Sequence, residues 1–180
     1  MEGSAAISDR DTSQDSLYAQ AAAAHGTALD RLARAYELDP EIRRDLLQEI
    51  HLQIWTSFAQ FDGRCSLRTW VYRIAHNVAT RHVIRQSRVR SRLVSIENIE
   101  TVAGDDRGEL AASQAEALQR LSALIQRLKP LDRQIIVSYL EDMDAVAIGE
   151  ITGLSPANVA MKVHRIKAIL RRWFGEVRFP

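Results

Sequence analysis

The chain has 180 residues, of which 46% are hydrophobic and 26% are charged, and its formal net charge at pH 7 is +1. This length suits one large or two small globular domains, and this composition disfavours a disordered or a fibrous protein. No apolar run is long enough to predict a membrane span, and Met1 to Gln14 lacks the pattern of a signal peptide. The single cysteine, Cys65, fits a reducing cytoplasm.

Charge is strongly segregated along the chain. Residues 1–63 carry −6, residues 64–92 carry +8 with eight Arg and no Asp or Glu, and residues 93–116 carry −5. Residues 117–150 carry −1, and residues 151–180 carry +5. Arg supplies 21 of the 24 positive charges, and its planar fork matches phosphates and guanine edges. Two basic segments therefore lie in acidic surroundings, although either one alone is equally well explained as a solvated helix face.

The N-terminal half predicts helices throughout. Residues 1–14 are expected to form a disordered tail, and the Ala- and Leu-rich residues 17–38 two helices separated at Gly26. Asp39-Pro40-Glu41 is typical of a helix start, and apolar residues at helical spacing continue it to Ala59. After a break at residues 61–63, Ser66 is expected to cap a further helix.

An acidic, Gly-containing segment separates this half from a second helical pattern. Residues 95–112 lack periodic apolar positions and predict a linker, whereas helices are expected from Ser113 and from Pro130. The predicted fold class is all-α, with two small helical domains joined by a flexible acidic linker. The expected bounds are residues 15–94 for the first domain and 113–175 for the second.

The second domain contains the pattern of a helix-turn-helix. A helix over Ala145 to Thr152 is expected to bury Val146, Ile148 and Ile151, with Gly149 letting a neighbouring helix approach. Gly153 supplies the turn, and Ser155-Pro156 begins the next helix.

One face of that last helix is polar and basic. It would bury Val159, Val163, Ile166 and Leu170 and present Asn158, Lys162, His164, Arg165, Lys167, Arg171 and Arg172. Early side chains that reach base edges, followed by a basic flank, are what a helix in the DNA major groove requires. A packing hairpin with a solvated face is the alternative, and the ordered coincidence of turn, cap and basic face favours DNA binding.

These residues resemble a known family. Residues 128–134 (LKPLDRQ), followed by 148–155 (IGEITGLS) and 158–165 (NVAMKVHR), resemble domain 4 of bacterial sigma factors, most closely the extracytoplasmic-function (ECF) type. The resemblance implies recognition of the minus-thirty-five promoter element and contact with the polymerase flap. Ala160 and Met161 depart from the usual Lys and Ser, so the base-reading surface is expected to be more apolar. The implied DNA-contacting residues are Ser155, Asn158, Met161, Lys162 and Arg165.

The N-terminal half supplies an independent resemblance. Residues 45–55 (DLLQEIHLQIW) are similar to the sigma domain 2 pattern whose polar face docks on the clamp helices of the largest polymerase subunit. Asp45, Gln48 and Glu49 share one helix face, and the resemblance implies that they contact core polymerase. Without the resemblance, such a face is usually just solvated.

Residues 61–77 (FDGRCSLRTWVYRIAHN) are similar to the sigma segment that binds the minus-ten element. A loop before an Arg-rich helix with aromatic residues suits single-stranded DNA, although Trp70 and Tyr72 could equally be core residues. In the family this loop receives an extruded base, and Cys65 within it is read as an incidental small residue rather than a sensor. Arg85, Arg88, Arg90 and Arg92 are expected to contact phosphates. The implied minus-ten residues are Phe61, Asp62, Gly63, Arg64, Ser66, Trp70, Arg73, Asn77 and Arg81.

Together these motifs resemble a two-domain ECF sigma factor of the sigma-70 family. The resemblance implies core RNA polymerase, promoter DNA and an anti-sigma factor as partners, with no cofactor, no small-molecule substrate and no direct membrane insertion. A helix-turn-helix regulator that binds duplex DNA without polymerase is the alternative. A metal enzyme is disfavoured, because the five His and one Cys show no His-Glu-x-x-His or Cys-x-x-Cys spacing.

Overall fold

The computed structural model describes residues 3–94 and 114–176, and within these ranges it contains seven α-helices, one short 3-10 helix and no strand. Side chains are described for residues 13–88 and 118–172. The all-α prediction is therefore confirmed, whereas the predicted linker over 95–112 lies outside the described residues.

Three long helices form the N-terminal domain: α1 (Gly3–Tyr36), α2 (Pro40–Ser57) and α3 (Leu67–Val94). The prediction of two helices broken at Gly26 is wrong, because α1 is continuous through this glycine. Buried residues recur on both sides of it, at Ala21, Leu29 and Leu32, and this packing outweighs the cost of about 1 kcal/mol for an interior glycine. The helix also begins at Gly3, within the stretch for which the sequence indicates a tail.

The starts of α2 and α3 follow the predicted capping. The Asp39 carboxylate accepts from the backbone N–H of Glu41 at 2.9 Å and of Ile42 at 3.1 Å. The Ser66 hydroxyl accepts from the Thr69 N–H at 3.0 Å, so it caps α3. Helix α2 ends at Ser57, and a 3-10 turn, η1 (Phe58–Gln60), carries buried Phe58 into the core.

Four helices form the C-terminal domain: α4 (Gln114–Gln126), α5 (Pro130–Leu140), α6 (Ala145–Thr152) and α7 (Pro156–Glu176). The predicted bounds of α6 and the start of α7 are confirmed. Gly153 has φ +77°, as its place in the turn requires. The buried stripe of α7 is also as predicted, with Val159, Val163, Ile166 and Leu170 in the core.

Two details of the helix-turn-helix differ from expectation. Val146 is 57% exposed rather than buried. Gly149 admits the turn rather than a neighbouring helix: a Cβ there would meet the Leu154 carbonyl oxygen at 2.6 Å. The glycine therefore lets the chain fold back tightly before α7 begins.

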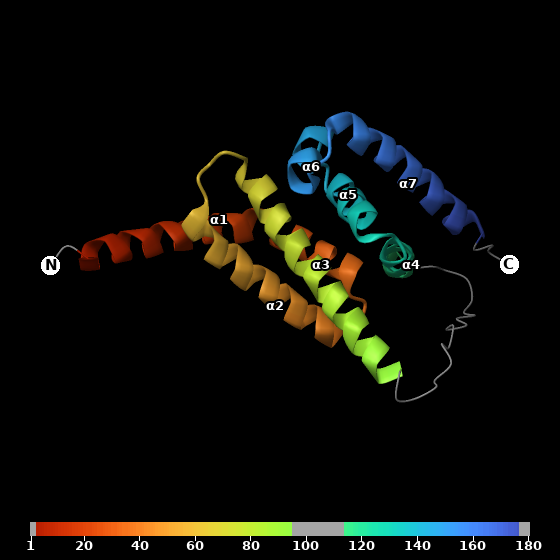
Figure 1. Cartoon of the computed structure of the whole chain (residues 1–180), viewed down its shortest axis with the longest axis horizontal. Coiled ribbons are helices and arrows are strands. Elements are labelled where there is room, and N and C mark those ends of the chain that lie inside the picture. The colour runs from red at the N-terminus through yellow and green to blue at the C-terminus, as the bar shows by residue number, and fades with distance from the viewer. Residues whose placement is uncertain (1–2, 95–113, 177–180) are drawn as a thin grey trace.

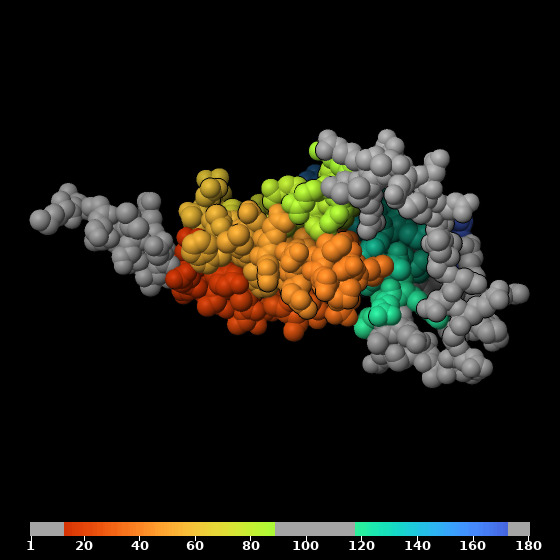
Figure 2. Space-filling view, turned by 90° about the horizontal axis from the view of Figure 1, so that it is seen from below, coloured from red at the N-terminus to blue at the C-terminus, as the bar shows by residue number. Residues whose placement is uncertain are grey.

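The two domains pack against each other. Helix α4 contacts α1, while α5 and α6 contact α3, so the helix-turn-helix lies beside the last helix of the N-terminal domain (Figure 1). Helices α1 and α2 form a continuous face, seen in Figure 2 in red and orange, which borders the C-terminal domain at one end.

Candidate nucleic-acid interface

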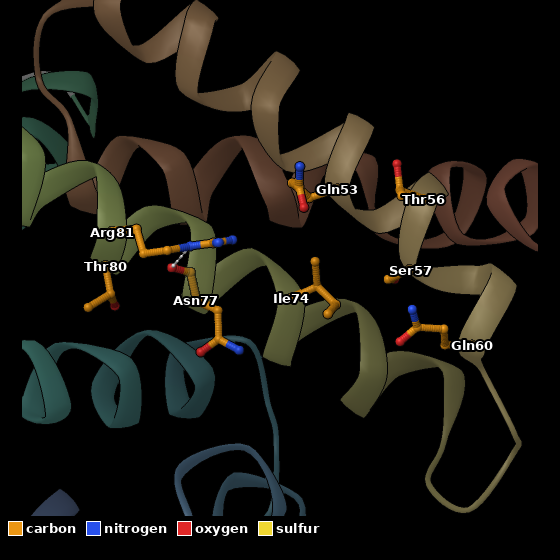
Figure 3. A pocket seen from close by; sticks show the side chains of 8 residues that line it. All are labelled: Gln53, Thr56, Ser57, Gln60, Ile74, Asn77, Thr80 and Arg81. Carbon is orange, nitrogen blue, oxygen red and sulfur yellow. Dashed lines mark hydrogen bonds between the residues drawn. The ribbon is translucent and has the colours of Figure 1, made fainter.

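A cleft of about 540 Å³ opens between α2 and α3. Figure 3 shows the side chains from both helices that line it, and all but the aliphatic Ile74 carry polar groups that could pair with base edges. The lining residues are Gln53, Thr56, Ser57, Gln60, Ile74, Asn77, Thr80 and Arg81.

Two residues of the predicted minus-ten site, Asn77 and Arg81, line this cleft. The Arg81 Nε donates to the Asn77 backbone carbonyl at 3.3 Å, which holds the Arg81 side chain against α3 (Figure 3). Both side chains are exposed. They can therefore offer an amide and a cation to a strand laid along α3.

The opposite wall of the cleft was missed by the sequence analysis. Gln53, Thr56 and Gln60 come from α2 and η1 and stand at i, i+3 and i+7 along the chain, which was a readable polar stripe. The family resemblance assigns a role only to the acidic face of the same helix, so it does not single out this stripe. Thr80 was missed because a lone threonine in an Arg-rich helix carries no pattern.

The loop over residues 61–66 supplies none of the residues lining this cleft. Phe61 is half-buried, with its ring 5.3 Å from that of Trp70 and 6.1 Å from that of Phe58. Trp70 Nε1 donates to the Ser57 hydroxyl at 2.9 Å. These two rings therefore support the base of the loop.

The tip of this loop is exposed. Asp62 and Arg64 form an ion pair at 2.9 Å, and Gly63 between them has φ +73°. The tip thus presents both a carboxylate and a guanidinium outward, while Ser66 serves the α3 cap.

Arg73 lies between the two domains. Its guanidinium is 6.0 Å from the Trp70 ring centroid, and its Nη2 donates to the backbone carbonyl of Glu150 on α6 at 3.2 Å. This predicted DNA contact is therefore engaged by the helix-turn-helix.

The predicted polymerase face of α2 is only partly free. Asp45 and Gln48 are exposed, whereas Glu49 is half-buried and its carboxylate pairs with Arg85 of α3 at 3.2 Å. Glu49, which is predicted to contact polymerase, and Arg85, which is predicted to contact phosphate, are therefore paired with each other in this structure.

Helix α1 braces α2 next to this face. The Tyr18 hydroxyl lies 3.0 Å from His51 Nδ1, and Trp55 Nε1 donates to Asp15 at 2.8 Å. Gln14, which is buried, donates to the Trp55 carbonyl at 2.7 Å. Partial burial lowers the pKa of His51, which favours its neutral form. The long α1 thus fixes the rotation of α2 and hence the direction in which Asp45 and Gln48 point.

Helix α7 presents most of the predicted minus-thirty-five residues. Asn158, Met161 and Arg165 are exposed, and the Ser155 hydroxyl accepts from the Asn158 N–H at 3.3 Å. Lys162 is engaged within the domain, because its Nζ lies 2.7 Å from the Asp132 carboxylate of α5. Met161 is 66% exposed, in line with an apolar base-reading surface.

Neither a metal site nor a membrane-spanning helix is found among the described residues. None of them forms a group of three or more His, Cys, Asp or Glu side chains able to hold a metal ion. Within the same ranges, no helix combines the length and apolar character that crossing a membrane requires.

A cleft bearing amide and hydroxyl groups beside an arginine-rich helix, together with a helix-turn-helix that exposes a basic face, is typical of a two-domain DNA-binding protein. Comparison with known families agrees with this class. Residues 22–89 match Sigma-70 region 2, and residues 118–170 match Sigma-70 region 4. The chain belongs to the sigma-70 family of RNA polymerase sigma factors and is of the ECF type.

Individual relatives support this assignment. The chain is 28% identical to RNA polymerase sigma factor CnrH of Cupriavidus metallidurans, over 85% of this chain and 84% of the relative. It is 26% identical to ECF RNA polymerase sigma factor SigX of Bacillus subtilis, over 74% and 71% of the two chains.

Solved structures share the fold. CnrH in complex with the cytosolic domain of CnrY matches with a TM-score of 0.67 at 20% identity, over 95% of this chain and 96% of that one. Sigma factor RpoE in complex with the anti-sigma factor NepR, from Bartonella quintana, matches with a TM-score of 0.64 at 21% identity, over 89% and 98%.

Proposed function

We propose a separate role in promoter-specific initiation for each of three surfaces of this sigma factor. Helix α2 docks on the clamp helices of the largest polymerase subunit through Asp45 and Gln48, with Glu49 joining after it releases Arg85. The cleft between α2 and α3 receives bases of the minus-ten element. Helix α7 reads the minus-thirty-five element, and the C-terminal domain contacts the flap. The polymerase performs the chemistry, and this chain supplies no catalytic group.

One observation carries the minus-ten assignment. The cleft brings amide, hydroxyl and guanidinium groups, including those of Asn77 and Arg81, together beside α3, the helix that carries most of the +8 segment. Amide and hydroxyl groups can pair with the edges of unstacked bases, and arginines beside them can hold the connecting phosphates. Extruding a base costs a few kcal/mol of stacking, which contacts of both kinds help to offset.

The exposed residues of α7 support the minus-thirty-five assignment. A helix that begins with Ser155 and Asn158 and continues with Arg165 has the order of groups found on helices that enter the major groove. Lys162 is paired with Asp132, so its ammonium is already held within the domain in this structure. Arg165 is therefore the stronger candidate for a direct contact.

An anti-sigma factor is the proposed negative regulator, and the cytoplasm the proposed compartment. The support is the related RpoE, whose solved structure contains the anti-sigma factor NepR. Such a partner would compete with core polymerase for the α1–α2 face or with DNA for α3.

Three variants test this division of labour in a reconstituted holoenzyme. Asp45→Lys should weaken core binding at least tenfold, because it places a cation on an acidic docking face. Asn77→Ala and Arg165→Ala should leave core binding unchanged and lower promoter-dependent transcription by about tenfold each, the value of one good base contact. Glu150→Lys, with the same charge change as Asp45→Lys but on α6, is the control for core binding. Unimpaired core binding by the Asp45 variant would contradict the docking assignment.

A further inference from the structure

One apolar side chain lies exposed on the arginine-rich helix α3. Ile84 is 44% exposed, and among residues 67–88 it is the only large hydrophobic side chain that is exposed rather than buried or half-buried. Val83, the residue before it, is half-buried and packs against the core. The core of the N-terminal domain therefore gains little from Ile84, and this side chain is available to a partner.

Ile84 shares a face of α3 with residues already assigned to DNA. On a helix with 3.6 residues per turn, side chains at i, i+4, i+7 and i+11 project from one side. Asn77, Arg81, Ile84 and Arg88 have this spacing, and all four are exposed. Arg85, also exposed, borders the same stripe. This face thus combines an amide, several arginines and one branched apolar group.

The charge around Ile84 fits nucleic acid. Residues 64–92 carry +8 without any acidic side chain, so a partner that covers Ile84 must also accept these arginines. The phosphates of DNA do so. The major groove is about 12 Å wide and admits an α-helix.

The apolar character of Ile84 narrows the choice of base. Among the groups by which base pairs are distinguished in the major groove, the apolar one is the 5-methyl group of thymine. A branched aliphatic side chain can cover this methyl group and exclude water from it, whereas it offers nothing to the donors and acceptors of the other bases.

We propose that Ile84 is a specificity-determining residue, which reads the 5-methyl group of a thymine in the duplex that borders the melted minus-ten bases. The proposal rests on the function proposed above for the α2–α3 cleft. Ile84 lies seven residues beyond Asn77, or about 10 Å along the helix axis. Successive bases of a strand are about 3.4 Å apart, so the thymine is expected within about three base pairs of the base held at Asn77.

The test removes the methyl group and the Ile84 side chain separately. The template is a promoter fragment that the reconstituted holoenzyme transcribes. Each thymine of its minus-ten region and upstream flank is replaced singly by deoxyuridine, which pairs in the same way but lacks the 5-methyl group. Run-off transcripts are measured at limiting holoenzyme with the native protein and with Ile84→Ala. We expect one replacement to lower the native transcript about fourfold, the value of one buried methyl group, and to have no effect with Ile84→Ala.

Leu38→Ala is the matched control, because Leu38 is 42% exposed but lies in the turn between α1 and α2. This variant should keep the full difference between thymine and deoxyuridine. The proposal is overturned if no thymine responds, or if the responsive thymine still responds in Ile84→Ala. An equal loss on both templates in Ile84→Ala would also overturn it, because Ile84 would then act without the methyl group. Failure of the function proposed above would appear separately, as holoenzyme transcription unaffected by Asn77→Ala.

Discussion

At the scale of single residues, buried His76 makes polar contacts to two helices. Its Nδ1 lies 3.0 Å from the Tyr36 hydroxyl of α1, and its Nε2 lies 2.9 Å from the Ser138 hydroxyl of α5. A neutral ring satisfies both contacts when Tyr36 donates to Nδ1 and Nε2–H donates to Ser138. Complete burial lowers the pKa of His76 to about 3, and burial raises the pKa of Tyr36, so both groups stay neutral.

This burial makes stability depend on pH with a definite sign. The pKa of His76 is lowered from 6.5 on folding, so its contribution is present above about pH 6.5 and is lost as the pH falls toward 3. We expect the free energy of unfolding to drop by about 1.4 kcal/mol from this residue between roughly pH 7.5 and 5.5. Urea unfolding of His76→Gln at both pH values should show a correspondingly smaller drop, although the variant is less stable at pH 7.5.

His164→Gln is the matched control, because His164 is exposed on α7. It should keep the full pH dependence of the native chain. An undiminished drop in the His76 variant would contradict the assignment of this effect to the buried ring.

At the scale of elements, local chemistry determined several helix starts. Asp39, Ser66 and Ser155 were identified as caps from the sequence, and each accepts the expected backbone N–H. Local sequence signals gave a wrong helix boundary where tertiary packing outweighed them. The sequence predicts a break at Gly26 because the helix cost of glycine is visible there, whereas the buried residues that hold α1 together across it depend on α2 and α3.

Two glycines in helices should therefore respond in opposite ways to alanine. Gly149→Ala places a methyl group 2.6 Å from the Leu154 carbonyl, and the forced shift should destabilise the protein by about 1–3 kcal/mol. Gly26→Ala meets nothing within 4 Å and should stabilise α1 by up to about 1 kcal/mol. Thermal unfolding of both variants measures the difference. Changes in Tm that are equal in the two variants, or reversed in sign, would contradict the role given to the turn after α6.

At the scale of the whole molecule, the net charge of +1 combines surfaces of opposite sign. The Arg-rich α3 and the basic α7 carry the positive segments, and the acidic side chains include the exposed Asp45 on α2. The sequence was sufficient to predict both domains, their order and the helix-turn-helix, because these leave periodic patterns and recognisable motifs. The face between the domains was not predicted. Glu141, Ser138 and Gln134 read as ordinary polar residues until the fold brings them to Tyr72, His76 and Thr80.

Run-off transcription with purified core polymerase tests the central claim most directly. Core enzyme is incubated with a pool of genomic fragments, with and without this protein, and co-purification with core is measured in parallel. The account predicts discrete transcripts from defined start points only when the protein is present, together with a stable complex with core. The absence of both the protein-dependent transcripts and the complex would contradict it.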